Sequence, residues 1–356
     1  MGEVFEFVQE GCVVLNNKNN IFIIYIFNVF MLSVLISYIY RVLPGFELRG
    51  TDTHAYIDFF IKNDYYFKQD YLFILFSKFI HVFTENPKNY LFINNFFINF
   101  MSFMAIYYIA NLYSKSIKKI HVLYFVIILL SFSSYHLLQI NALRQAVGLP
   151  FLLFSIYFFL KKNYKISYLF LLVASGFHSS YYIIFITYYI FFKLNKNFVK
   201  FNLIFIIFSI IFMGSYYYLS NFFSSYYILN KFNTLNREST GFITPQVKYL
   251  YLWIIFITIY FLNRIQIKRF AILNPLLLYY SFLVTVLPFI NIRMIINRYF
   301  LTGEILLIVI FPIFFINFEK KSRFVIGYIY LILILLFLIN FPTIQHEFNF
   351  NLKGLI

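Results

Sequence analysis

Residues 121–160 read HVLYFVIILLSFSSYHLLQINALRQAVGLPFLLFSIYFFL, in which apolar runs over 121–139 and 142–160 are separated by a short break. Each run is close to the roughly 20 residues that a helix needs to cross a bilayer. The stretch therefore predicts two consecutive membrane-spanning helices. It also places Arg144 at the start of the second helix, where a charge is costly unless it holds an anion.

Similar apolar runs recur along the whole chain. Of its 356 residues, 62% are apolar and 12% are charged, which is typical of a polytopic membrane protein. We expect an all-α helical bundle of about nine to eleven membrane segments, forming one membrane domain over residues 1–356. The predicted spans are 21–40, 89–112, 121–139, 142–160, 199–219, 247–263, 271–290, 297–317 and 324–341. Two more stretches, 71–83 and 166–192, are expected to dip into the membrane instead of crossing it once.

Basic residues, mostly lysines, gather in alternate loops of this prediction, near residues 115–119, 161–165, 193–200, 264–269 and 320–323. Because positively charged loops tend to stay in the cytoplasm, we place these loops and the N-terminus inside. The 166–192 stretch must then return to its own side, with a turn at His178. The outer segments are 41–88, a first loop with helices, and 220–246, a long loop, together with 140–144, 291–298 and the C-terminal tail.

Six arginines fall on the opposite side from these basic loops, whereas Arg264, Arg269 and Arg323 lie within them. The outer arginines are Arg41, Arg49, Arg144, Arg237, Arg293 and Arg298. Arginine offers a fixed fork of donors that suits the oxygens of a phosphate, so we expect a lipid phosphate or diphosphate as their partner. Without a soluble basic domain, the net charge of +16 does not indicate nucleic-acid binding. A single cysteine and the absence of Cys/His pairs at ligand spacing predict no metal and no cofactor.

The start of the 142–160 span carries a polar stripe. Asn141, Arg144, Gln145 and Gly148 stand at i, i+3, i+4 and i+7, which is one face of a helix. The stripe predicts an anion clamp in which Gln145 is a second donor and Gly148 leaves room for a ligand. The alternative is an arginine that reaches the interface as many do near helix ends. Pro150 is expected to kink or loosen the helix below the stripe.

His178 stands beside Gly176 at a predicted helix break. Imidazole exchanges a proton near neutral pH, so His178 is a candidate base or orienting group for a hydroxyl. The alternative is a structural histidine whose hydrogen bonds are satisfied within the fold.

The first outer loop contains Arg49-Gly-Thr-Asp52-Thr-His-Ala-Tyr56. Asp52 and Tyr56 share a helical face at i and i+4, where they can hold sugar hydroxyls, and Thr51 or Asp52 can cap the helix. Local chemistry favours the alternative, an ordinary capped helix whose acidic residues Asp58, Asp64 and Asp70 lie on a solvated face.

A fourth cluster lies near the start of the 297–317 span. Arg293, Asn297 and Glu304 share one helical face, and Arg298 and Tyr299 follow Asn297 directly. Glu304 must pair or stay protonated inside the membrane, so it either ties helices together through an arginine or transfers a proton.

At these residues the chain resembles the EpsG-type, Wzy-like family of membrane polysaccharide polymerases. The resemblance runs in order from about residue 20 to residue 320. It rests on four motifs: Arg49-Gly-Thr-Asp52-Thr-x-x-Tyr56, Leu143-Arg144-Gln145-Ala146, Gly176-Phe-His178-Ser179 and Asn297-Arg298-Tyr299.

The resemblance implies a membrane glycosyltransferase, with GT-C-like architecture, at the outer face of the bacterial inner membrane. Such an enzyme polymerises repeat units carried on undecaprenyl diphosphate into O-antigen, capsule or exopolysaccharide without a metal, and a chain-length regulator is a possible protein partner. Guanidinium groups can stabilise the departing diphosphate. We assign that role to Arg144 and Arg298 first, with Arg49 and Arg293 as helpers. His178 is the preferred base and Asp52 the alternative, while Tyr56, Gln145, Asn297 and Tyr299 are predicted to bind substrate.

Two other classes fit part of this pattern. A flippase for the same lipid-linked units would also line a cavity with arginines, but it should carry internal repeats and charges that reach both faces. The sequence has no convincing repeat. A polyprenyl-phosphate-sugar glycosyltransferase would usually need an acidic pair early in the outer loop, for which only Asp52 and Asp58 are candidates.

Overall fold

The structure is a computed structural model that describes residues 2–42, 53–62, 70–112, 133–140, 142–178 and 181. All the regular structure within these residues is helical, which confirms the predicted all-α class. The helices are α1 (Gly2–Arg41), α2 (Thr53–Lys62), α3 (Tyr71–His81), α4 (Pro87–Asn111), α6 (Ser133–Ile140), α7 (Leu143–Leu160) and α8 (Tyr164–Phe177).

Three helices are long and apolar enough to cross a membrane. They are the Phe22–Arg41 part of α1, α4 and α7, and they confirm the predicted spans 21–40, 89–112 and 142–160. Helix α6 is the end of the predicted span 121–139. The fold is therefore that of an all-α polytopic membrane protein. The spans predicted beyond residue 181 lie outside the described residues.

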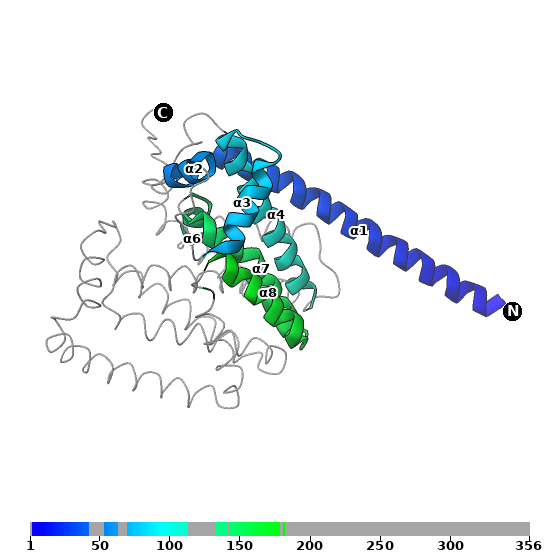
Figure 1. Cartoon of the computed structure of the whole chain (residues 1–356). Helices are drawn as coiled ribbons and strands as arrows, with labels where there is room; N and C mark the ends of the chain where they lie inside the picture. Colours follow the sequence, from blue (N-terminus) through cyan, green and yellow to red (C-terminus); the bar gives the residue numbers. More distant parts are fainter. Residues whose placement is uncertain are drawn as a thin grey trace, which may run out of the picture.

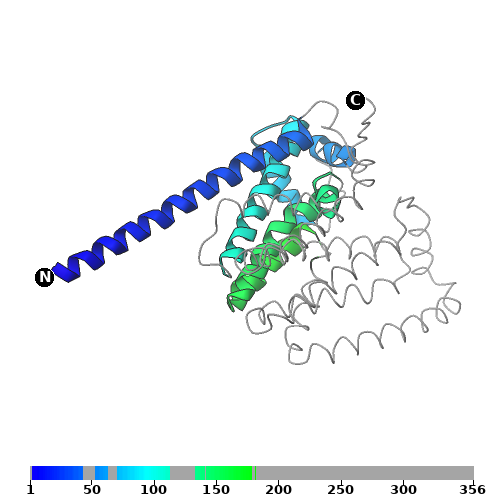
Figure 2. The ribbon, with the colours of Figure 1, turned by 180° about the vertical axis from the view of Figure 1, so that it is seen from behind.

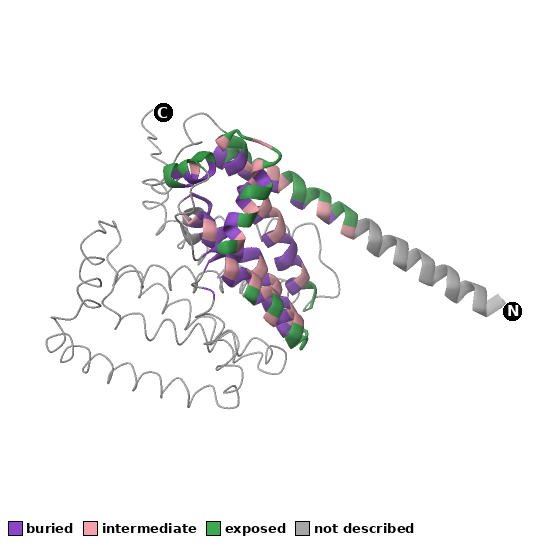
Figure 3. Ribbon diagram, in the orientation of Figure 1, coloured by how far each residue is buried: buried purple, intermediate pink, exposed green. Residues whose placement is uncertain are grey.

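Exposed apolar side chains agree with this setting. Phe27 and Leu35 on α1 are 62% and 55% exposed, and Leu169 and Leu172 on α8 are 60% and 57% exposed. Large apolar side chains that stay exposed on helices of this kind suit contact with lipid, which covers them without cost. Figure 3 shows buried residues on the sides of the helices that face one another and exposed residues on outward sides.

Helices α1 and α4 form an antiparallel pair. Near one end Tyr25 stacks on Tyr107 with ring centroids 3.9 Å apart, and its hydroxyl donates to the carbonyl of Phe103 at 3.1 Å. Towards the other end Asn99 Nδ2 donates to Ser37 Oγ at 3.1 Å. The N-terminal half of α1 runs away from the other helices (Figures 1 and 2). A helix of 40 residues is about 60 Å long, so this half extends past the bundle.

Helices α7 and α8 form a hairpin that closes at exposed lysines. Lys161 and Lys162 make the turn, with Lys162 at a φ of 61°, and the side chain of Asn163 caps α8 by accepting from the N–H of Ile166. Deeper in the hairpin, Ser155 Oγ donates to the carbonyl of Ser167 at 2.9 Å, and Ser167 Oγ donates to that of Ser155 at 2.8 Å. Small residues at such positions allow two helix backbones to approach closely.

The same seam continues at Gly148. A Cβ at this position would lie 2.5 Å from Tyr181 Cε2 and 3.1 Å from the carbonyl oxygen of Ala174. Gly148 therefore gives room to Tyr181 and to the backbone of α8, and the expectation that it leaves space for a ligand is wrong. Helix α7 continues through Pro150 to Leu160.

The two short helices α2 and α3 pack against α4. Phe60 of α2 stacks on Tyr90 of α4 at 4.1 Å, and Phe76 of α3 lies 5.0 Å from Phe97 of α4 and 6.0 Å from Phe177 of α8. With 11 residues, α3 is about 16 Å long, which is too short to cross a bilayer.

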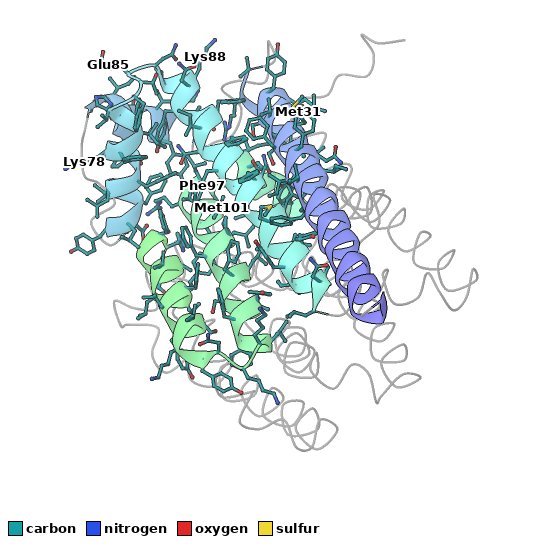
Figure 4. The ribbon with its side chains drawn as sticks, turned by 90° about the vertical axis from the view of Figure 1, so that its right-hand side faces the viewer. Met31, Lys78, Glu85, Lys88, Phe97 and Met101 are labelled. Carbon is teal, nitrogen blue, oxygen red and sulfur yellow. The ribbon has the colours of Figure 1, made fainter. Side chains whose placement is uncertain are left out.

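The connection between α3 and α4 marks one end of the bundle. In Figure 4 the charged side chains of Glu85 and Lys88 lie at this end, while Phe97 and Met101 lie farther along α4 among the helices. Glu85 and Lys88 are both exposed. Helix α4 begins here with Pro87 and with Asn86, whose side chain accepts from the N–H of Lys88 at 2.9 Å.

Candidate functional site

A buried arginine joins four helices near the end of the bundle where α3 connects to α4. Arg41, the last residue of α1, is 0% exposed. Its Nη1 donates to Thr53 Oγ1 at the start of α2 at 3.2 Å. Its Nη2 donates to the carbonyls of Gln139 and Ile140, the last residues of α6, the latter at 3.3 Å. Asn95 of α4, in the amide orientation that its neighbours require, accepts from Arg41 Nε at 3.3 Å.

More polar groups extend this network along α4. Asn99 Oδ1 accepts from the hydroxyl of Tyr135 and from Gln139 Nε2, the latter at 2.9 Å. Asn95 and Asn99 lie 8 and 12 residues after Pro87, which corresponds to depths of about 12 and 18 Å along the helix. Hydrogen bonds at such depth have no competing water, so the network fixes how α1, α2, α4 and α6 meet.

Thr53 connects the start of α2 to the segment that leads into α7. Its Oγ1 donates to the carbonyl of Ile140 at 3.1 Å, and Ile140 is the last residue of α6, which precedes α7 in the chain. The beginning of α2, directly after Asp52, therefore lies beside the segment that carries Arg144. Asp52 and Arg49 themselves lie outside the described residues, as does Asn141.

The predicted anion-binding residue Arg144 is paired with a carboxylate. Arg144 Nη1 contacts Asp70 Oδ2, and the two side chains are 24% and 3% exposed. Asp70 directly precedes α3, and its carbonyl accepts from the N–H groups of Phe73 at 3.1 Å and Ile74 at 3.2 Å. Asp70 is 2% exposed, so the expectation that it lies on a solvated face is wrong, whereas Asp58, paired with Lys62 at 3.6 Å, is solvated as expected.

Gln145 and His178 lie on either side of Tyr181. The hydroxyl of Tyr181 donates to the carbonyl of Gln145 at 2.5 Å, and its N–H donates to the carbonyl of His178 at 3.1 Å. The side-chain Nε2 of Gln145, a residue 3% exposed, has no hydrogen-bond partner among the residues that the structure describes. His178 is 7% exposed and ends α8 with extended backbone at φ −156°, which confirms the predicted helix break.

Helix ends thus converge on one junction, where α3 and α7 begin and α8 ends. Gly176 of α8 lies against Leu72 of α3, and a Cβ on Gly176 would be 2.6 Å from Leu72 Cδ1. The first N–H groups of α7 have no acceptor inside their own helix, and the helix dipole is positive at that end. Together with Arg144, the start of α7 favours an anion.

The structure brings some of the predicted site residues together, buries one of them against a neighbouring helix, and does not describe the others. Arg144, Gln145 and His178 gather at the junction. Tyr56 is 3% exposed and packs on Phe73 of α3 with ring centroids 5.9 Å apart, so its predicted contact with substrate stays a prediction. The remaining predicted residues lie outside the described residues; they are Arg49, Asp52, Arg293, Asn297, Arg298 and Tyr299, together with Glu304.

Sequence reasoning gave no role to Thr53, and it misread Asp70 and Arg41. The expectation that Arg41 binds a phosphate is wrong, because the residue is fully buried and bonded to protein carbonyls. Asp70 had one usable signal, since an aspartate directly before an apolar run is typical of a helix start. The part of the chain that the structure describes holds no group of three or more His, Cys, Asp or Glu residues, and the expected metal-free reaction stays a prediction.

Comparison with known proteins gives one match. The sequence model described as the EpsG family matches residues 23–352, which covers the described helices from the second half of α1 onward and most of the rest of the chain. Neither a curated protein nor a solved structure matches the chain.

Proposed function

We propose that this chain, which belongs to the EpsG family of Wzy-like polysaccharide polymerases, joins lipid-linked oligosaccharide repeat units into a polymer at the outer face of the bacterial inner membrane. The observation that carries the proposal is the junction itself. It brings Arg144 and the start of α7 beside the helix break at His178, in a part of the chain that the family match covers.

In the proposed reaction a hydroxyl oxygen of one repeat unit forms a bond to the anomeric carbon of the sugar chain held on another lipid carrier. The bond from that carbon to the diphosphate oxygen breaks with its electron pair, and the hydroxyl proton passes to a base. Undecaprenyl diphosphate leaves. Negative charge grows on the diphosphate as the bond breaks, so the transition state gains most from cations that are already in place.

Arg144 is the residue that we assign to this charge. Its side chain is 24% exposed, so it is held by the protein and still reachable. The positive end of the α7 dipole adds to its field, and both act in a site with little water, where electrostatic interactions are strong. Gln145 is a second donor in this proposal, because its buried Nε2 has no partner among the described residues.

His178 is the proposed base for the attacking hydroxyl, with Asp52 as the alternative. The carbonyl of His178 is bound by the N–H of Tyr181, which holds the residue at the end of α8 beside the start of α7. Arg298 and the helpers Arg49 and Arg293, with Tyr56, Asn297 and Tyr299, complete the proposed substrate site.

The proposed orientation places the junction in the periplasm and the N-terminus in the cytoplasm. Arg144 and the exposed turn of Lys161 and Lys162 lie at opposite ends of α7. The positive-inside rule keeps the lysine end in the cytoplasm, so the arginine end faces outward.

Deletion of the gene followed by complementation tests the function. We expect the deletion strain to display single repeat units in place of long chains, wild-type protein to restore the chains, and Arg144→Ala to fail. Arg144→Lys keeps the charge but loses the planar fork, so it should restore only part of the polymer.

The matched control is Lys62→Ala, which removes an exposed cation that is paired only across a helix surface. It should behave as wild type, because exposed pairs contribute little. Long chains in the deletion strain would contradict a polymerase, and units trapped inside the cell would favour a flippase.

A further inference from the structure

The pair of Asp70 and Arg144 has a consequence beyond the leaving-group role of the arginine. We infer that Asp70 is a positioning residue: its carboxylate holds one edge of the Arg144 guanidinium so that another edge faces the lipid diphosphate. The inference rests on the proposed function, and it names a residue that the sequence motifs do not contain.

Asp70 is attached to a rigid part of the fold. Its carbonyl accepts the first hydrogen bonds of α3, and α3 is fixed against α8 by Leu72 and by Phe76. The Asp70 side chain is 3% exposed, so it has little freedom to move. An arginine has many rotamers, and a carboxylate that binds one side of its fork removes most of them while other N–H groups stay directed elsewhere.

The charge of Asp70 acts against simple anion binding. A carboxylate beside Arg144 cancels much of the positive field that a diphosphate would meet. If Asp70 were only a competitor for the guanidinium, removing it would strengthen binding of an anion and speed the reaction. A positioning role predicts that removing Asp70 slows the reaction. The loss of a fixed orientation of Arg144 then outweighs the gain from the stronger positive field.

Three substitutions in the purified full-length protein separate these roles. Asp70→Asn keeps an oxygen that accepts from the guanidinium and removes the charge. Asp70→Ala removes both, and Asp70→Glu keeps the charge but moves it by one methylene. The readouts are kcat and KM with lipid-linked repeat units, and binding of farnesyl diphosphate as a probe for the isoprenyl diphosphate group.

We expect Asp70→Ala to lower kcat by about 100-fold and Asp70→Glu by about 10-fold, with smaller changes in KM. Asp70→Asn should stay within about 5-fold of wild type, because the acceptor oxygen remains. Combining Asp70→Ala with Arg144→Ala should cost no more than Arg144→Ala alone, since residues that act as a unit are not additive. Asp58→Ala, an exposed carboxylate on α2, is the control and should match wild type.

Faster turnover or tighter farnesyl diphosphate binding in Asp70→Ala or Asp70→Asn would overturn the inference and make Asp70 a competitor. Wild-type kcat in both Asp70→Ala and Asp70→Glu would also overturn it. If Asp70→Ala does not fold, the difference between Asp70→Asn and Asp70→Glu carries the test, and equal activity of these two is the contradicting result. If Arg144→Ala keeps full activity, the proposed catalytic role of Arg144 is wrong. If Arg144→Ala loses activity while the Asp70 variants keep it, only the positioning role of Asp70 is wrong.

Discussion

Replacing Gly148 with alanine tests the packing that joins the start of α7 to the end of α8. The new Cβ would lie 2.5 Å from Tyr181 Cε2, 3.1 Å from the carbonyl oxygen of Ala174 and 3.2 Å from Phe177 Cβ. Ordinary contact begins at 3.4 Å, so the ring of Tyr181 must retreat by about 0.9 Å (3.4 minus 2.5) or the two helices must separate.

The effects on stability and activity should differ. An extra methyl group in a close-packed interface costs about 1–3 kcal/mol, and alanine recovers up to about 1 kcal/mol over glycine through helix propensity, so the net loss of unfolding free energy is about 1 kcal/mol. The Tyr181 hydroxyl, however, binds the carbonyl of Gln145 at 2.5 Å. Moving it by almost 1 Å shifts His178 relative to Arg144, and such a displacement can reduce a rate by about 100-fold.

The assay measures the thermal unfolding midpoint of the purified protein and its rate of polymer formation. Leu169→Ala is the control, because this side chain of α8 is 60% exposed and its truncation leaves the contacts at the junction in place. Adding Tyr181→Leu to Gly148→Ala should recover the unfolding midpoint. The reasoning is refuted if Gly148→Ala unfolds and polymerises as wild type, or if Tyr181→Leu gives no recovery.

The other predictions concern the buried network and the helix seam. Arg41→Leu removes the donor to the carbonyl of Gln139 and should lower the free energy of unfolding by about 1–3 kcal/mol, measured by denaturation in detergent; an unchanged midpoint would contradict the network's structural role. Ser155→Ala, which removes the hydroxyl that donates to the carbonyl of Ser167 but keeps the side chain small, should cost about 0.6 kcal/mol in the same measurement. Ser155→Leu should cost several times more because it forces α7 and α8 apart, and equal effects of the two substitutions would show that the seam is not closely packed.

Much of the fold could be predicted because crossing a membrane imposes a length and a composition. The predicted spans 89–112 and 142–160 agree closely with α4, Pro87–Asn111, and α7, Leu143–Leu160. The break at His178 was predicted from Gly176 and from the need of the lysine loops to share one side. These properties are local, so a single sequence is enough to show them.

Partners far apart in the chain could not be predicted in this way. Asp70 and Arg144 are 74 residues apart in the chain. Asp70 also follows Asp58 and Asp64 at regular spacing, a pattern typical of a helix face that is exposed to solvent. The sequence alone does not distinguish Arg41 from the arginines predicted to bind substrate. Its contacts with Thr53 and with the end of α6 place it inside the bundle. From the sequence, Gly148 could either leave space for a ligand or allow close helix packing. The position of the Tyr181 ring against Gly148 shows that it allows close packing.

The most direct test of the central claim uses lipid-linked repeat units isolated from the deletion strain and the purified protein. The account predicts chains that grow by one repeat unit at a time, with one polyprenyl diphosphate released for each linkage formed, and it predicts that Arg144→Ala lowers this release by about 100-fold or more. Release at the wild-type rate by Arg144→Ala, or no chain growth with the wild-type protein, would contradict it.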